Sequence, residues 1–228
     1  MSAREGAVPA ARGTTTTDTD RMTAFSDGVF AIVITLLVLE LRPPAYESGG
    51  LLDALLHEKA AYLAFVISFV YIGVLWLNHH ALLLLVGRTN LALNWINLAL
   101  LLGAVIIPFP TAVLASAFAH AGAADQRVAV VLYALSAALM SVPWLAFFAY
   151  LERHPALLAP GISTEHLHAQ RARPITGIFL YGSSAALGWF VNPVVGLVGI
   201  IVMIIYHAVT SQGLRRRSNR RLPGRRRT

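Results

Sequence analysis

Long apolar runs alternate with short polar stretches along the chain, and this pattern predicts an all-α integral membrane protein. A helix needs about 20 mainly apolar residues to cross the hydrocarbon core of a bilayer. Six segments of roughly this length carry few charges: 22–41, 60–86, 91–118, 127–151, 174–191 and 193–212. We therefore predict six transmembrane helices in one membrane domain, 21–213, between a polar N-terminal tail, 1–20, and a basic C-terminal tail, 214–228.

Several residues mark where these helices begin, break or end. Asn90 is a plausible N-cap of the third helix, and the Pro108-Phe109-Pro110 stretch should break it. Asn192 and Pro193 open the sixth helix, where the missing N–H of proline costs nothing. Because so little sequence separates the last two segments, we expect them to form a tight antiparallel hairpin. The longest internal connection, 152–173, carries many charged residues and His and should lie in water.

Composition supports the membrane interpretation and excludes several other classes of protein. The chain is 57% hydrophobic and only 13% charged, whereas soluble domains carry about 25% charged residues. There are no cysteines, which excludes disulfides, thiol catalysis and cysteine metal sites. We expect an integral membrane protein rather than a soluble enzyme, with no cofactor and no bound metal.

Positive charge predicts the orientation of the chain. If both termini are cytoplasmic, that side holds fifteen of the eighteen Lys and Arg residues, eight of them in the C-terminal tail. An even number of spans also requires both termini on one side. No signal peptide is evident, so the first apolar run is interpreted as a retained helix of a multi-pass protein in the cell membrane. The tail arginines are expected to contact anionic lipid, and the absence of interleaved aromatic residues argues against nucleic acid.

The first helix carries polar residues at its inner end that need partners. Asp27 would be costly at membrane depth unless it is paired or hydrated. Arg21, six residues earlier, does not share its helical face. The end of the second helix and the start of the third lie at the same membrane level as Asp27. They carry the candidate partners Trp76, Asn78, His79, His80 and Asn97. We favour a buried network that locks the helices together over a gate or proton site.

The outer half of the first helix is apolar. Ile32, Leu36 and Leu39 follow the i, i+4, i+7 spacing of one helical stripe, with Thr35 beside it. A core or lipid contact is the ordinary explanation of such a stripe. Glu40 follows at the outer end, where a ring of carboxylates in an oligomer would attract cations, although a lone surface glutamate is commoner.

One motif in this region is specific enough to indicate a family. The stretch Arg21-x-x-x-Phe25-Ser26-Asp27 resembles the signature that opens the first helix of the transmembrane protein 175 potassium channels. The resemblance continues through 76–80 in the second helix and through 97–111 in the third. The last three helices match only in number and hydropathy. The motif occurs once, so the chain resembles the single-repeat prokaryotic form of the family.

The resemblance implies a homotetrameric channel whose pore is lined by the first helix of each subunit. Family members have rings of apolar side chains at the narrowest levels, which here fall on Ile32, Leu36 and Leu39, with Thr35 an alternative to Leu36 for the second ring. They lack the carbonyl filter of ordinary potassium channels, and no Thr-Val-Gly-Tyr-Gly occurs here. Dehydration at an apolar ring would then give modest selectivity for potassium, which holds water less tightly than sodium, and dewetting could close the pore.

Two other functions remain open from the sequence. Asp27, His79 and His80 near membrane depth could serve a proton channel or a proton-coupled transporter, although no inverted repeat is visible. His154, Glu165, His166 and His168 share one loop and could hold a metal, but they lack an HExxH pattern and solvated loop residues are the simpler interpretation.

Overall fold

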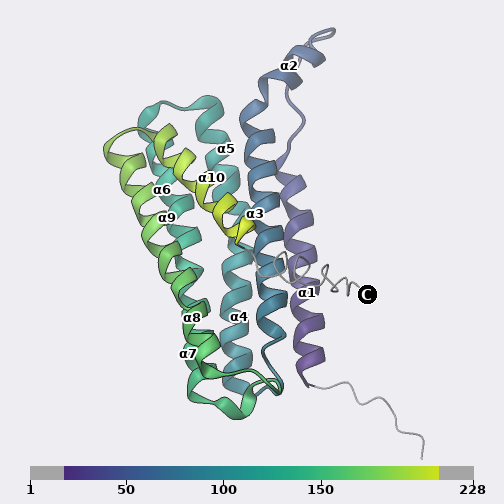
Figure 1. The fold of residues 1–228 in the computed structure, drawn as a ribbon. Helices are drawn as coiled ribbons and strands as arrows, with labels where there is room; N and C mark the ends of the chain where they lie inside the picture. The colour runs from purple at the N-terminus through teal and green to yellow at the C-terminus, as the bar shows by residue number, and fades with distance from the viewer. Residues whose placement is uncertain (1–17, 211–228) are drawn as a thin grey trace, which may run out of the picture.

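The computed structural model describes residues 18–210, except for the side chains of residues 165, 166 and 169. Helices run up and down a single bundle (Figure 1). We call the end where α1 begins the inner end and the opposite end the outer end. In chain order the elements are α1 (Asp18–Leu36), η1 (Leu37–Glu40), α2 (Leu51–His57), α3 (Lys59–Leu83), α4 (Leu91–Ile106), α5 (Pro108–His120), α6 (Ala123–Leu139), α7 (Ser141–Arg153), η2 (Pro155–Leu157), α8 (Thr164–Gln170), α9 (Ala172–Phe190) and α10 (Pro193–Val209).

The all-helical, multi-pass prediction is confirmed for the described residues, and each of the six expected segments is helical as far as it is described. Four stretches are long and apolar enough to cross a membrane: Thr19–Glu40, Lys59–Leu83, Leu91–His120 and Ala123–Arg153. The apolar helix Pro193–Val209 is shorter. It packs closely against α9 as the second arm of the expected hairpin (Figure 1).

Two of the long spans are interrupted at prolines. A proline cannot donate the hydrogen bond that a helix interior requires and clashes with the carbonyl four residues earlier. The expected break at Pro108 is present: α4 ends at Ile106 and α5 begins at Pro108. The sequence did not predict the equivalent break in the fourth segment, where Pro143 ends α6 at Leu139 and α7 resumes at Ser141.

The core of the bundle forms around α3, which contacts α1, α5 and α10. Its Tyr71 and Ile72 are fully buried, together with Tyr133 of α6 and Ile200 of α10. The α9–α10 hairpin is joined by very close backbone contact. A Cβ added at Gly196 would lie 2.6 Å from the Cα of Gly188. Small residues allow this approach, as is common between membrane helices.

The connection 152–173 is more ordered than the sequence suggested. It contains α8, and its backbone pairs with the turn between α3 and α4, where Gly87 N donates to Leu157 O at 2.8 Å and Ala159 N donates to Leu85 O at 2.9 Å. Glu152 accepts a hydrogen bond from Arg171 at 3.0 Å. The segment is thus partly helical and satisfies many of its backbone polar groups against the inner end of the bundle, while its position in water stays a prediction.

The residues between α1 and α3 contain the short helix α2, which the sequence analysis left as a loop. Its residues are exposed or half-exposed, and it projects from the outer end of the bundle (Figure 1). Seven residues give too weak a periodic signal to separate a helix from a loop.

Candidate functional site: the two faces of the first helix

One face of α1 is buried against α3 and α4. Met22, Ser26, Phe30, Val33 and Leu37 recur every three or four residues along this face, and each is nearly or fully buried. Among the described residues, the main contacts of α1 are with these two helices and with η1. Only Ser26 is polar in this set, and it is 0% exposed. The helix therefore carries a single buried hydroxyl into an apolar interface, where it needs partners.

Ser26 belongs to a chain of hydrogen bonds that joins three helices. Its hydroxyl donates to Met22 O at 2.8 Å and accepts from the Asn97 amide nitrogen of α4 at 3.0 Å. The Asn97 carbonyl oxygen lies 2.8 Å from His79 Nε2 of α3. Because the only hydroxyl proton of Ser26 goes to a backbone carbonyl, Asn97 must donate to Ser26 and accept from His79. His79 is therefore protonated at Nε2 in its neutral form.

The remaining nitrogen of His79 lies in apolar surroundings. His79 Nδ1 is buried and has no hydrogen-bond partner among the residues that the structure describes. Its ring packs against Phe30 at a centroid distance of 5.2 Å and against Trp144 of α7 at 6.4 Å. The sequence analysis did not identify Phe30 or Trp144, because an aromatic residue in an apolar run gives no sign of what its ring contacts.

Asp27 has a partner on α3, as its position at membrane depth required. Trp76 Nε1 donates to Asp27 Oδ1 at 2.9 Å, and a hydrogen bond to a charged acceptor is stronger than one between neutral groups. The Trp76 ring also contacts His80 at a centroid distance of 6.1 Å. This second contact lies closer to the exposed side of the interface than the Ser26–Asn97–His79 chain.

Three of the residues grouped with this network lie elsewhere. Arg21 and Phe25 are on the exposed side of α1, and Phe25 is 56% exposed. Asn78 is on another face of α3, where its amide nitrogen donates to Val74 O at 3.0 Å and it lines a cavity next to α7 and α9. Consecutive helical residues lie about 100° apart, which separates Asn78 from His79.

The opposite face of α1 is exposed within the described part of the subunit, residues 18–210. Ile32 is 60% exposed, Leu36 41% and Leu39 69%, and Thr35 is exposed beside them. The Thr35 hydroxyl donates to Ala31 O and Ile32 O at 3.1 and 2.8 Å, so its hydrogen-bonding capacity is used inside the helix. From the sequence, the stripe of Ile32, Leu36 and Leu39 could face the subunit core, lipid or a pore. The structure shows that it is not part of the subunit core.

The outer end of this stripe tightens into the 3₁₀ turn η1, Leu37–Glu40. A 3₁₀ turn advances by about 120° per residue instead of about 100°, so Leu39 is rotated relative to a continuous α-helix. Glu40 lines a groove at the outer end whose walls also carry Arg42, Glu58 and Asp125. The expected attraction of cations by Glu40 stays a prediction.

A second buried polar cluster went unnoticed in the sequence. Ser68 of α3 lies 2.7 Å from the Thr111 hydroxyl of α5 and 3.1 Å from the Tyr133 hydroxyl of α6. Each is an isolated polar residue in an apolar run, which was the available signal. Among the described residues, no group of three or more His, Asp or Glu side chains is placed to hold a metal. The side chains of Glu165 and His166 lie outside that description.

The sequence and the structure of this chain are both similar to those of known ion channels. Residues 21–108 match the family model described as the endosomal/lysosomal potassium channel TMEM175. A potassium channel of Streptomyces collinus is 36% identical over 177 residues, covering 77% of this chain and 85% of the relative. The crystal structure of a lysosomal potassium-selective channel TMEM175 homolog from Chamaesiphon minutus superposes with a TM-score of 0.73 at 36% identity. It covers 86% of this chain and 98% of that one.

The animal relatives carry a different functional name. The human endosomal/lysosomal proton channel TMEM175 is 39% identical over 87 residues. This match covers 34% of the present chain and 17% of the human protein, so it is confined to one part of a much longer relative.

Proposed function

This chain belongs to the TMEM175 family of ion channels, and from that premise we propose that it conducts potassium through a pore lined by four copies of α1. The family and its curated relatives are channels rather than enzymes. We further propose that the channel is a homotetramer with six membrane-spanning helices per subunit. It lies in the cell membrane with both termini in the cytoplasm. The arginines expected to contact anionic lipid lie outside the described residues.

The observation that supports the proposal most directly is the division of α1 into two faces. Polar residues on one face bind α3 and α4, while the apolar residues Ile32, Leu36 and Leu39 on the other are left exposed by the part of the subunit that the structure describes. A channel-lining helix needs such a division, because one side must be fixed to its own subunit and the other must meet the permeant ion.

The buried network sets which side chains reach the pore axis. A change of one residue in helical register turns the side chains by about 100°. The Ser26–Asn97–His79 hydrogen bonds hold α1 in one rotation relative to α3 and α4. In this rotation Ile32 is directed away from the subunit core, and Leu36 and Leu39 follow about 6 and 10 Å further along the axis.

An apolar constriction would select ions by dehydration. Side chains of Ile and Leu cannot replace the waters that an ion sheds, so an ion that holds its hydration shell less tightly passes more readily. Potassium is favoured over sodium on this ground, and the preference is modest because no oxygen ligands compensate the loss. The same ring can close by dewetting, which would make it both filter and gate. Potassium is the permeant ion, and no cofactor is required.

The second candidate function is proton conduction or proton-coupled transport. Asp27 and His79 lie on adjacent helices at one membrane level, and the animal relatives are named proton channels. A pH-gradient assay in liposomes without potassium would separate the two functions, since a proton channel would dissipate the gradient and a strict potassium channel would not.

Flux through purified protein in liposomes tests the main proposal. Wild type should pass potassium faster than sodium, and Ile32→Asn should weaken the preference because the amide oxygen can coordinate either ion in place of the water that it sheds. Ile205→Asn places the same substitution at a 56% exposed position of α10 and should leave the preference unchanged. Equal selectivity in Ile32→Asn and wild type would remove Ile32 from the filter.

A further inference from the structure

Trp144 of α7 contacts the His79 ring from outside the region that carries the family motif. The two ring centroids are 6.4 Å apart, and the rings are almost perpendicular, at 86°. Trp144 also packs against Phe148, one turn later on the same helix, at 6.3 Å. The family match covers residues 21–108, so it assigns Trp144 no role. The contact with His79 is therefore a feature that the motif does not describe.

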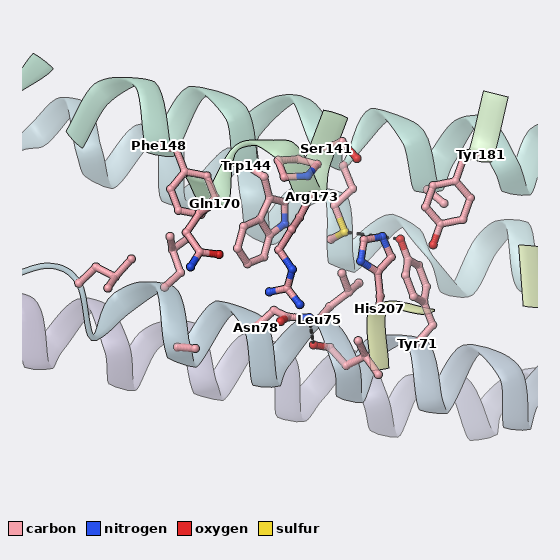
Figure 2. Close-up of a pocket in the computed structure, with 17 residues that line it drawn as sticks. Tyr71, Leu75, Asn78, Ser141, Trp144, Phe148, Gln170, Arg173, Tyr181 and His207 are labelled. Atoms are coloured by element: carbon pink, nitrogen blue, oxygen red, sulfur yellow. Dashed lines mark hydrogen bonds between the residues drawn. The ribbon is translucent and has the colours of Figure 1, made fainter. Parts of the chain in front are cut away.

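Trp144 also forms part of the wall of a cavity of about 80 Å³, which lies among α3, α7, α9 and α10 (Figure 2). A single water needs about 10–15 Å³ of such volume, so the cavity has room for several waters. Asn78 and Arg173 give it polar walls. His79 is not among the residues that line the cavity, although its neighbour Asn78 is. Trp144 thus borders both the cavity and the buried ring of His79.

The hydrogen-bond chain between His79 and α1 has two possible directions. In the direction that the structure favours, His79 Nε2 donates to Asn97 and Asn97 donates to Ser26, whose own proton goes to a backbone carbonyl. In the opposite direction, Ser26 donates to a flipped Asn97 amide, the amide donates to His79 Nε2, and the His79 proton lies on Nδ1. The heavy atoms keep their places in both.

The opposite direction requires an acceptor for a proton on His79 Nδ1. This nitrogen is buried and has no hydrogen-bond partner among the described residues. A buried N–H without an acceptor loses the hydrogen bond that it would make with water. One water beside Nδ1 would remove this cost and bring the two directions close in free energy. The cavity that Trp144 borders could supply such a water.

We propose that Trp144 keeps the water of this cavity away from His79 Nδ1 and so fixes the direction of the chain that holds α1. The proton then stays on Nε2, and Asn97 presents its amide nitrogen to Ser26. Trp144 is a positioning residue, because it acts on α1 through His79 and Asn97. The tautomer of His79 does not depend on the proposed ion pathway, whereas an effect on selectivity rests on it.

¹⁵N NMR of histidine-labelled protein in lipid bilayers tests the tautomer, because protonated and bare ring nitrogens differ in chemical shift. At about pH 8, where histidine is neutral, the wild type should carry the His79 proton on Nε2. Trp144→Ala should raise the Nδ1–H form from less than about 10% of the population to about half, since water then reaches Nδ1. The signal lost in His79→Gln identifies this residue among the eight histidines of the chain. An unchanged tautomer in Trp144→Ala would overturn the proposal.

Two matched variants separate this role from a general loss of packing. Trp144→Phe keeps an aromatic wall and should retain mainly the Nε2–H form. Trp189→Ala removes a tryptophan of α9 that is 47% exposed and does not line the cavity, and it should behave like the wild type. The wild type gives a test that needs no variant to fold. Magnetisation transferred from water should reach His154, which is exposed at the end of α7, but not His79 Nδ1, and rapid transfer to Nδ1 would also overturn the proposal.

Ion selectivity is measured on the same variants from reversal potentials in planar bilayers. A chain that exchanges between two directions holds α1 less firmly. The ratio of potassium to sodium permeability should therefore fall several-fold in Trp144→Ala and recover in Trp144→Phe. A changed tautomer with unchanged selectivity would support the role of Trp144 and count against the pore along α1.

Discussion

Replacement of Asn97 by leucine tests whether the buried network positions the pore-lining helix. Leucine has nearly the same shape as asparagine but cannot form hydrogen bonds. The variant loses the contact of the Asn97 amide with Ser26 at 3.0 Å and the contact of its carbonyl oxygen with His79 at 2.8 Å. Ser26 keeps its bond to Met22 O, whereas His79 Nε2 loses its acceptor and has no other among the described residues.

The loss of stability follows from these two bonds. Hydrogen bonds between membrane helices contribute on average about 0.6 kcal/mol and up to about 1.7 kcal/mol each. Leaving the donor of His79 unpaired at a site that is 1% exposed moves the total toward the upper value. We expect a loss of about 1–3 kcal/mol, which is enough to weaken the attachment of α1 without unfolding the bundle. The apolar packing of Phe30, Val33 and Leu37 remains.

The effect of Asn97→Leu on ion selectivity should be larger than its loss of stability suggests. With the Trp76–Asp27 hydrogen bond as the remaining polar contact between α1 and α3, α1 can rotate more freely, and Ile32 is held less firmly in one direction. The ratio of potassium to sodium permeability, measured from reversal potentials in planar bilayers, should fall several-fold. Stability is measured in parallel as the melting temperature of the detergent-solubilised oligomer.

Asn94→Leu is the matched control, because it places the same substitution one turn earlier on α4 at an exposed position. It should retain the selectivity of the wild type. The reasoning would be refuted if Asn97→Leu were as stable and as selective as Asn94→Leu, because the network would then contribute neither to packing nor to the rotation of α1.

Two further substitutions test separate contacts. Gly196→Ala should destabilise the α9–α10 hairpin by about 1–3 kcal/mol, because its Cβ would meet the Gly188 backbone at 2.6 Å. The control Gly182→Ala, whose Cβ would have nothing within 4 Å, should melt like the wild type. Equal melting temperatures of the two variants would contradict the close packing. Trp76→Phe removes the hydrogen bond to Asp27, so the inner end of α1 should shift and potassium flux in liposomes should become slower. Normal flux with normal selectivity would show that this contact is dispensable.

Much of the fold could be predicted from the sequence because its signals are local. The lengths of the apolar runs identified each long helix, and Asn90 caps α4 by accepting from Leu93 N at 2.9 Å, as expected. Asn192 similarly accepts from Val194 N at 2.8 Å. The break caused by Pro143 and the helix α2 were missed. Their signals, a single proline and seven residues, were weaker than the long apolar pattern around them.

The candidate site was predictable in its members but not in its pairing. Polar residues are rare in apolar helices, so Ser26, Asp27, Trp76, His79 and Asn97 stood out in the sequence. Which of them meet depends on the rotation and separation of three helices. That geometry joined Ser26 to Asn97 and Asp27 to Trp76, and it turned Asn78 away into a different cavity.

The sequence by itself determined that this is a multi-pass helical membrane protein with an unusual polar entrance to its first helix, because hydropathy, charge and spacing act along the chain. Only the tertiary structure decided which face of that helix is bound to its own subunit and which is left open. The physical reason is that the spacing of residues in a helix shows only which of them lie on the same face. What that face contacts depends on how the neighbouring helices pack.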